Sequence, residues 1–402
     1  MALCPLMIFL ICDIMAWILR ERSNETMKHV LEHLLWFIKK NVVMTVALLA
    51  AVITSFIVPP DTAYLNYFDV KTLTCLFCVL AVVCALKNIG FFYTLAKQIV
   101  IIFRDARMCI LALVYITFIG SMLIANDMAL LTFLPLGYFV LTTAKKTKYM
   151  AFTFIMQNIA ANLGGMLTPF GNPQNLYLYT FFEIPTLEFM GIMAPPFLLS
   201  VALITVCCLL FIRPEVLRIQ NDPIHLPPAR TVLYLVLFAL SIAIVFRGIP
   251  YWIGLIVIPL VLMFADRKAL KNVDYPLLLT FVFFFIFSGN MARIDAVRGF
   301  FSMLLDKSTL IFSVLSCQVI SNVPSAILLS QFTENYRELL VGVNIGGTGT
   351  LIASLASLIT FREYTHHNPT RTGYYIKRFS AFNFGFLAIL TAFMLVLNHF
   401  IL

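Results

Sequence analysis

The chain has 402 residues, of which 61% are hydrophobic and only 12% are charged. A soluble protein has an apolar share of about 45–50% and a charged share of about 25%, so this composition excludes an ordinary soluble enzyme and indicates a polytopic membrane protein. The net charge of +9 accompanies no basic run interleaved with aromatic residues. We therefore attribute it to basic loops on one side of a membrane rather than to nucleic-acid binding.

Residues 1–40 form a hydrophobic or amphipathic N-terminal segment. Residues 2–19 could be a spanning helix, an interfacial helix or an uncleaved signal-like segment, and Asp13 weakens each alternative. No small-residue cleavage site follows this stretch, so we do not predict a signal peptide.

Seven apolar runs after residue 40 are bounded by charged residues and predict simple membrane spans, since about 20 apolar residues cross a ~30 Å hydrocarbon core. Basic residues gather in alternate loops, which places the loop at 213–230 in the cytoplasm and the C-terminus on the outer side. We therefore expect a multi-pass protein of a bacterial inner membrane, embedded in the lipid bilayer. The runs are 42–59, 70–86, 187–212, 231–246, 251–265, 275–289 and 379–400.

A broken helix is predicted at residues 149–182, which hold NLGGMLTPFGNPQN at their centre. As one continuous helix these 34 residues would measure about 51 Å, far more than the bilayer requires. Glycine, proline and amide residues at this depth are tolerated where protein or a water-filled cavity satisfies the backbone.

Two further stretches turn at a polar tip. Residues 308–333 turn at Ser321 and Asn322, and these 26 residues allow arms of only about 18 Å, which favours a re-entrant hairpin. Residues 108–144 turn at Asn126 and Asp127, and their length permits either a hairpin or two short spans. Basic residues at both ends place those ends on one side of the membrane under either alternative.

The predicted elements recur in the same order in two halves of opposite orientation. Each half has an amphipathic surface stretch (90–104 or 291–305), then a hairpin and a broken helix, and ANLGGMLT at 161–168 aligns with VNIGGTGT at 343–350. The predicted fold class is an all-α polytopic membrane protein with two inverted repeats, each containing a re-entrant hairpin and a broken transmembrane helix. The predicted segments are the N-terminal segment 1–40, repeat 1 at 41–213, a linker with one helix at 214–248, and repeat 2 at 249–402.

Discontinuous elements at corresponding positions of two inverted repeats indicate the midplane site of a secondary transporter. Half-helix N-termini attract anionic groups, while free carbonyls and Asn, Ser and Thr oxygens coordinate Na⁺. The alternative is that these polar residues merely hold helices together in lipid. One candidate cluster contains Asn126, Asn162, Thr168, Gly171, Asn172 and Asn175, and the other contains Ser321, Asn322, Asn344, Gly346, Thr348 and Thr350.

These residues are assigned to two roles. Substrate binding is predicted for Asn126, Thr168, Asn172, Asn175, Ser321, Asn322 and Thr350. Binding of Na⁺ or H⁺ is predicted for Ser121, Asn126, Asp127, Asn162, Gly165, Gly171, Asn322, Asn344 and Gly347.

Asp127 is an acidic residue well inside a predicted hairpin. An intramembrane carboxylate is costly and points to an ion, proton or counter-ion role, with a salt bridge as the alternative. The sequence has no Walker A motif, nucleophile elbow or HExxH motif, so neither an ATP-driven pump nor an enzyme is expected. We predict no cofactor and no metal other than a coupling Na⁺.

The two tips resemble a known family. IANDMALLTFLPL at 124–136 and ISNVPSAILL at 320–329 resemble the paired hairpin-tip motifs of the ion transporter superfamily. This group includes citrate-transporter-like permeases, divalent anion:sodium symporters, arsenite permeases and a sodium/proton antiporter branch. TPFGNPQN at 168–175 is similar to the sodium-site and substrate-site loop of the anion symporters, and TLIASLASLI at 350–359 is more like the arsenite permeases.

The resemblance implies a scaffold domain, a mobile transport domain that holds both hairpins, a homodimer, and elevator-type movement of a small anion with Na⁺ or H⁺. In the carboxylate symporters each tip reads Ser-Asn-Thr, and the asparagine touches both substrate and sodium. Asn126, Ser321 and Asn322 match that pattern, and Ser121 lies where a further sodium ligand would be. The threonines are replaced by Asp127 and Val323, and Asp127 would repel a dianion unless it is protonated or holds a cation.

Three functions follow as hypotheses. The first is cation-coupled secondary transport of a small anion such as a di- or tricarboxylate. The second is Na⁺/H⁺ antiport or arsenite-type efflux in which Asp127 carries the ion. The third, a non-transporting membrane receptor, is disfavoured because we recognise no appended soluble domain.

Overall fold

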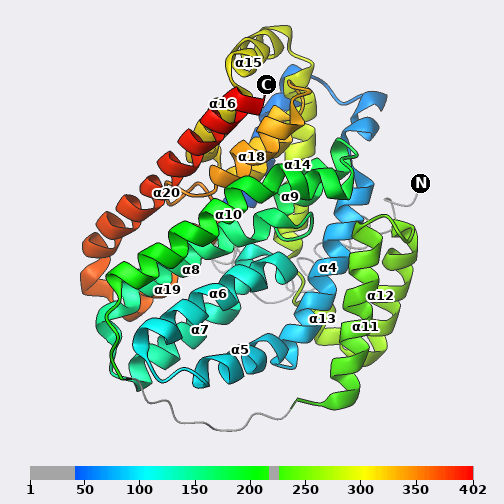
Figure 1. Cartoon of the computed structure of the whole chain (residues 1–402). Coiled ribbons are helices and arrows are strands. Elements are labelled where there is room, and N and C mark those ends of the chain that lie inside the picture. The colour runs from blue at the N-terminus through cyan, green and yellow to red at the C-terminus, as the bar shows by residue number, and fades with distance from the viewer. Residues whose placement is uncertain (1–40, 217–225, 402) are drawn as a thin grey trace, which may run out of the picture. The chain divides into compact units, whose positions relative to one another are not determined.

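The computed structural model describes residues 41–216 and 226–401, and it is built from helices with one isolated antiparallel bridge between Asp105 and Val216 (Figure 1). No β-strand occurs among these residues, so the all-α prediction is confirmed. The predicted N-terminal segment at 1–40 lies outside the described residues, as does the centre of the predicted cytoplasmic loop at 213–230.

Helices occupy all seven runs predicted as simple spans. Of these, α3 and α12 have 16 and 15 residues and are therefore only about 24 and 22 Å long, shorter than a ~30 Å hydrocarbon core. Several other described helices are long and apolar enough to cross a membrane. The seven are α3 (Val42–Ile57), α4 (Val70–Asn88), α10 (Thr186–Phe211), α11 (Pro228–Val245), α12 (Tyr251–Ala265), α14 (Tyr275–Ala292) and α20 (Thr372–Ile401).

The described residues fall into two compact units. The smaller unit joins residues 41–70 to residues 275–290, and the larger contains residues 71–274 and the chain from 291 onward, within the described ranges. These spatial units do not follow the predicted boundaries of the repeats, because each unit takes segments from both halves of the chain.

In the smaller unit a polar contact joins α14 to α3. The amide Nδ2 of Asn290 donates to the hydroxyl oxygens of Thr54 and Ser55, at 3.3 Å each. Tyr67 lies against Gly289, where a Cβ atom would come within 2.5 Å of the ring. This unit also contains the 3₁₀ turn η2 (Thr62–Tyr67).

The larger unit contains both predicted hairpins and both predicted broken helices, which are therefore confirmed as interruptions of the helical chain. The first hairpin is α6 (Ala106–Ile124) and α7 (Asn126–Thr143), and the second is α16 (Thr309–Ile320) and α17 (Asn322–Leu329). The first broken helix is α8 (Met150–Gly164), η4 (Gly165–Leu167) and α9 (Pro173–Phe181), and the second is α18 (Tyr336–Ile345) and α19 (Leu355–His367).

The two hairpins differ in length. The arms of the first have 19 and 18 residues, or about 28 Å each. α6 is long and apolar enough to cross a membrane by itself. The arms of the second have 12 and 8 residues, or about 18 and 12 Å. The short arms support the predicted re-entrant form of the second hairpin. The longer arms of the first are compatible with either a re-entrant hairpin or two short membrane spans.

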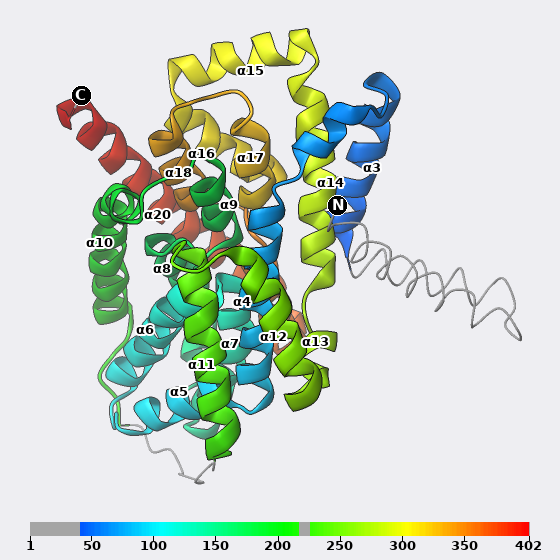
Figure 2. The same ribbon diagram turned by 90° about the vertical axis from the view of Figure 1, so that its right-hand side faces the viewer.

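Short helices lie at two ends of the larger unit. In both views α5 (Phe91–Ile101) is at the end near the α6–α7 hairpin, and α15 (Asp295–Lys307) is at the end near α16 (Figures 1 and 2). This placement matches the two amphipathic surface stretches predicted at 90–104 and 291–305. The connecting elements are η3 (Thr147–Tyr149), α13 (Arg267–Lys271) and η5 (Pro369–Arg371).

Glu215 connects the segment after α10 to the turn that precedes α8. Its carboxylate accepts hydrogen bonds from Lys146 and Lys148 at 2.5 Å and from the Tyr149 hydroxyl at 2.8 Å. Hydrogen bonds to the charged form, first from Lys146, lower the pKa of Glu215 to about 2. The carboxylate therefore stays charged throughout the physiological pH range, with its hydrogen bonds intact.

Candidate functional site

Both hairpins turn through the same unusual backbone conformation. Ala125 has φ 64° and ψ 150°, and Ser321 has φ 75° and ψ 161°. This region of φ/ψ space is almost confined to glycine and costs of order 1–3 kcal/mol, so it persists where the surroundings enforce it. Such strain concentrates at ligand-binding sites and at segments that switch conformation.

The asparagine after each turn folds its side-chain oxygen back onto its own helix. Asn126 Oδ1 accepts from the Asp127 N–H at 3.0 Å, and Asn322 Oδ1 accepts from the Val323 N–H at 2.9 Å. The oxygen is thereby used within the hairpin, and the Nδ2 donor is directed elsewhere. The Asn126 donor reaches Asn162 Oδ1 at 3.4 Å, which joins the first tip to the first broken helix.

A matching threonine fixes each hairpin to its broken helix. Thr168 Oγ1 donates to the Met122 carbonyl at 2.8 Å, and Thr350 Oγ1 donates to the Gln318 carbonyl at 3.1 Å. Met122 and Gln318 each stand three residues before their tip. The contacts therefore recur at the positions that the alignment of ANLGGMLT with VNIGGTGT predicts.

The second half of each broken helix also starts at a matching position. Asn172 precedes α9 and Ser354 precedes α19, both with an extended backbone, and these positions coincide when Thr168 is aligned with Thr350. The spacing from the threonine to the start of the second half is thus the same in both broken helices. This agreement supports an internal repeat, while the opposite orientation of its halves in a membrane stays a prediction.

Asn344 links the two broken helices directly. Its Oδ1 accepts from Asn172 Nδ2 at 3.2 Å and from Gln174 Nε2 at 3.5 Å, and its Nδ2 donates to Asn175 Oδ1 at 2.6 Å. Asn175 Nδ2 in turn contacts carbonyls of the first break, the nearest being Gly165 O at 3.1 Å. Since all four side chains are buried, these bonds hold the two breaks in one rigid arrangement.

Gly347 lies where both halves meet. A Cβ atom at this residue would be 3.1 Å from Asn322 Nδ2 and 3.4 Å from Asn162 Oδ1. Asn322 also anchors its own tip, because its backbone N–H donates to the Ala353 carbonyl at 2.9 Å. Gly347 of the second break therefore lies next to the second tip and the first broken helix. The first tip reaches the same place through the hydrogen bond from Asn126 to Asn162.

Three side-chain oxygens, at the first hairpin tip and at the start of α9 in the first broken helix, have no hydrogen-bond partner within the described residues. They are Oδ1 of Asp127, Oδ1 of Asn172 and Oε1 of Gln174, all screened from solvent. An unpaired buried acceptor costs free energy, and oxygens of this kind are ligands for a cation. Asp127 also stands in the first turn of α7, where the helix dipole favours negative charge.

The remaining predicted site residues have local roles. Ser121 donates to the Phe118 carbonyl of its own helix at 2.8 Å, and Gly171 packs against the Gly165 carbonyl. Ser321 contacts Asn322 Oδ1 and the Ala353 carbonyl, at 3.3 Å each.

Sequence reasoning missed two amides that support the site. Gln318 spans the second break, donating to the Gly346 carbonyl at 2.8 Å and accepting from the Thr350 N–H at 2.9 Å. The backbone carbonyl of Asn158 accepts from Asn162 Nδ2 at 3.1 Å, and its side-chain Nδ2 donates to Asn383 Oδ1 of α20 at 3.2 Å. An amide inside an apolar helix close to a predicted tip or break is the signal that could have identified them.

The model of the citrate transporter family matches residues 15–335 of the chain. An uncharacterized transporter of Methanocaldococcus jannaschii is 32% identical over 293 residues, which cover 73% of this chain and 80% of that protein. The inner membrane protein YbiR of Escherichia coli is 29% identical over 286 residues, covering 68% and 74%. The chain is therefore a membrane transporter that belongs to the citrate transporter family.

Proposed function

We propose that this protein is a secondary active transporter that moves a small di- or tricarboxylate-like anion, coupled to Na⁺ or H⁺. The observation that carries the proposal is the convergence of Asn126, Asn162, Asn322 and Gly347 with both helix breaks. Strained tips and interrupted helices are costly in a bilayer, and transporters use such elements for binding.

The anion would bind to donors at the tips. The amide Nδ2 groups of Asn126 and Asn322 are directed away from their own hairpins, since each Oδ1 is bonded to the following N–H. α7 and α17 begin at these tips, and the partial positive charge of a helix N-terminus favours an anion. These groups bind carboxylate oxygens without a cationic side chain.

A coupling cation would compensate the negative charge of the bound anion and of Asp127. None of the side chains in the network is a lysine or arginine, and Asp127 adds a carboxylate beside the first tip. The unpaired oxygens of Asp127, Asn172 and Gln174 are suitable ligands for Na⁺, and Asp127 can alternatively take a proton. The anion is thus expected to bind together with its coupling ion, which is the basis of coupled transport.

The movement that exposes the site alternately to the two sides would be of the elevator type. The hairpins and broken helices are linked by the Asn172–Asn344–Asn175 bonds and by the Thr168 and Thr350 bonds, so they are suited to move as one body. We place this transporter in an inner membrane as a homodimer, with the 213–230 loop in the cytoplasm and the C-terminus outside.

The experiment that tests the proposal is uptake of radiolabelled citrate, succinate and sulfate by proteoliposomes, under a sodium gradient, a proton gradient or neither. We expect at least one anion to be taken up several-fold faster with one of the gradients. Protein-free liposomes are the control, and uptake of all three anions at the liposome rate under every gradient would contradict the proposal.

A second candidate function is Na⁺/H⁺ antiport or arsenite-type efflux through Asp127. The unpaired, buried Oδ1 of this carboxylate favours it. In that case the Asp127→Asn protein would lose sodium-driven proton movement, and the wild-type protein would not take up the labelled anions. Anion uptake by the wild type together with full uptake by Asp127→Asn would exclude the carboxylate as the ion carrier.

A further inference from the structure

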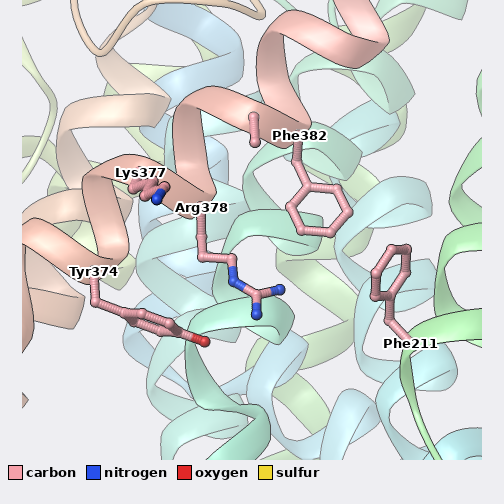
Figure 3. A pocket seen from close by; sticks show the side chains of 6 residues that line it. Phe211, Tyr374, Lys377, Arg378 and Phe382 are labelled. Atoms are coloured by element: carbon pink, nitrogen blue, oxygen red, sulfur yellow. The ribbon is translucent and has the colours of Figure 1, made fainter.

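A cavity lies apart from the hairpin tips, between the end of α10 and the first turns of α20. It is open to the surface and has a volume of about 610 Å³. Arg378 extends into the space between Tyr374 and Phe211 (Figure 3). None of the lining residues belongs to the asparagine network, so the cavity is distinct from the proposed transport site. Its lining residues are Phe211, Tyr374, Lys377, Arg378, Ala381 and Phe382.

The cavity has an aromatic floor. The rings of Phe211 and Phe382 meet edge to face at 5.2 Å between centroids, and Phe152 of α8 packs against both, at 5.6 and 5.4 Å. Three helices therefore contribute one apolar surface. Such a surface is suited to a hydrocarbon chain.

Two cationic side chains, Lys377 and Arg378, line the cavity together with these aromatic rings. Lys377 and Arg378 are exposed, and neither forms an ion pair with any residue in the described part of the chain. The Arg378 guanidinium lies over the Tyr374 ring at 5.4 Å from its centroid, a contact that orients its donors. The cavity thus combines an apolar floor with two uncompensated positive charges.

The length of α20 places these charges at the membrane boundary. Its 30 residues measure about 45 Å, which exceeds a ~30 Å core by several turns. The chain after Arg378 contains no Lys, Arg, Asp or Glu, so the apolar part of α20 fills the core and Lys377 and Arg378 lie at its edge. Phe211, the last residue of α10, lies at the same level because it contacts Phe382.

We propose that this cavity binds an anionic phospholipid, with the headgroup phosphate at Lys377 and Arg378 and an acyl chain on Phe211 and Phe382. Charge complementarity identifies the headgroup, since a zwitterionic lipid would offset part of the attraction with its own cation. The aromatic floor distinguishes a lipid from a free phosphate, which has no apolar part to bury.

Native mass spectrometry of the purified protein titrated with phosphatidylglycerol or phosphatidylcholine tests the proposal. We expect phosphatidylglycerol to bind the wild type at least tenfold more tightly than phosphatidylcholine. The Lys377→Gln/Arg378→Gln protein should lose about 25-fold in phosphatidylglycerol affinity, because each cation near a membrane surface contributes about a factor of five. Both side chains are exposed, so this variant should fold as the wild type does.

The matched control is Lys268→Gln/Lys271→Gln, which removes the same charge from two exposed residues of α13. Its phosphatidylglycerol affinity should stay within twofold of the wild type. A change below threefold in the Lys377/Arg378 variant would overturn the proposal, as would equal binding of the two lipids. If that variant instead loses a dimeric species while lipid retention is unchanged, the cavity is a contact between two copies and the lipid proposal fails.

Discussion

Replacement of Gly164 by alanine is expected to lower the free energy of unfolding by about 2–3 kcal/mol or more. A Cβ atom at Gly164 would lie 2.2 Å from the Phe118 carbonyl oxygen and 2.6 Å from Ser121 Oγ. The first contact is with backbone, which cannot rotate away, so α8 must separate from α6. Denaturant unfolding of the purified protein in detergent, followed by circular dichroism, measures the change.

Gly191→Ala is the control, because this helical glycine of α10 has no atom within 4 Å of its Cβ position, whereas Gly164, the last residue of α8, is closely packed. Alanine there should stabilise α10 by about 0.5–1 kcal/mol, since glycine is a poor helix former. The two substitutions are therefore expected to have opposite signs. Wild-type stability in the Gly164 variant would show that the close approach of α6 and α8 is not as described.

The second large effect is expected for Asn344→Ala, which removes the residue that joins the two broken helices. Asn175 Oδ1 would lose its Asn344 donor, and Asn172 and Gln174 would lose their common acceptor. Each buried polar group left unsatisfied costs about 1–3 kcal/mol, so we expect a loss of about 3 kcal/mol in stability. Uptake per folded molecule should fall by about tenfold or more, as measured in proteoliposomes with the protein amount normalised.

Asn368→Ala serves as the control for this variant. Asn368 is a half-buried asparagine at the end of α19 whose side chain contacts Met150 Sδ and the Tyr364 carbonyl. Its replacement should cost less than about 1 kcal/mol, because it satisfies no other side-chain amide. Equal uptake by the Asn344 and Asn368 variants would argue against a functional role for the network.

The sequence alone was enough to locate the interruptions of the helices. A cluster of glycine, proline and amide residues marks the break after Gly164, and a polar tip marks the turns at Ala125 and Ser321. A single proline is not sufficient, because α7, α10 and α12 continue through internal prolines. The alignment of Thr168 with Thr350 was also predictive, since both make the same hydrogen bond.

Other features depend on the packing of distant segments and could not be predicted. The hydrogen bonds of Asn172 and Asn175 to Asn344 join two segments far apart in the sequence, and substrate binding by both asparagines stays a prediction. Gln318 was missed because it lies in an apolar helix and its partners, Gly346 and Thr350, lie in the second break, far along the chain. The division into spatial units also differs from the predicted repeats. The units are defined by contacts in space, and the smaller unit joins residues from both halves of the chain.

Counterflow of a transported radiolabelled anion by Asn126→Ala and Asn322→Ala proteins tests binding at the hairpin tips most directly. Each variant removes one Nδ2 donor from a tip, and Asn368→Ala provides the control for loss of an asparagine elsewhere. We predict that each tip variant loses at least about tenfold in exchange rate, as expected for a lost hydrogen bond to a charged group, while the control keeps the wild-type rate. Wild-type exchange in both tip variants would contradict the assignment of the site.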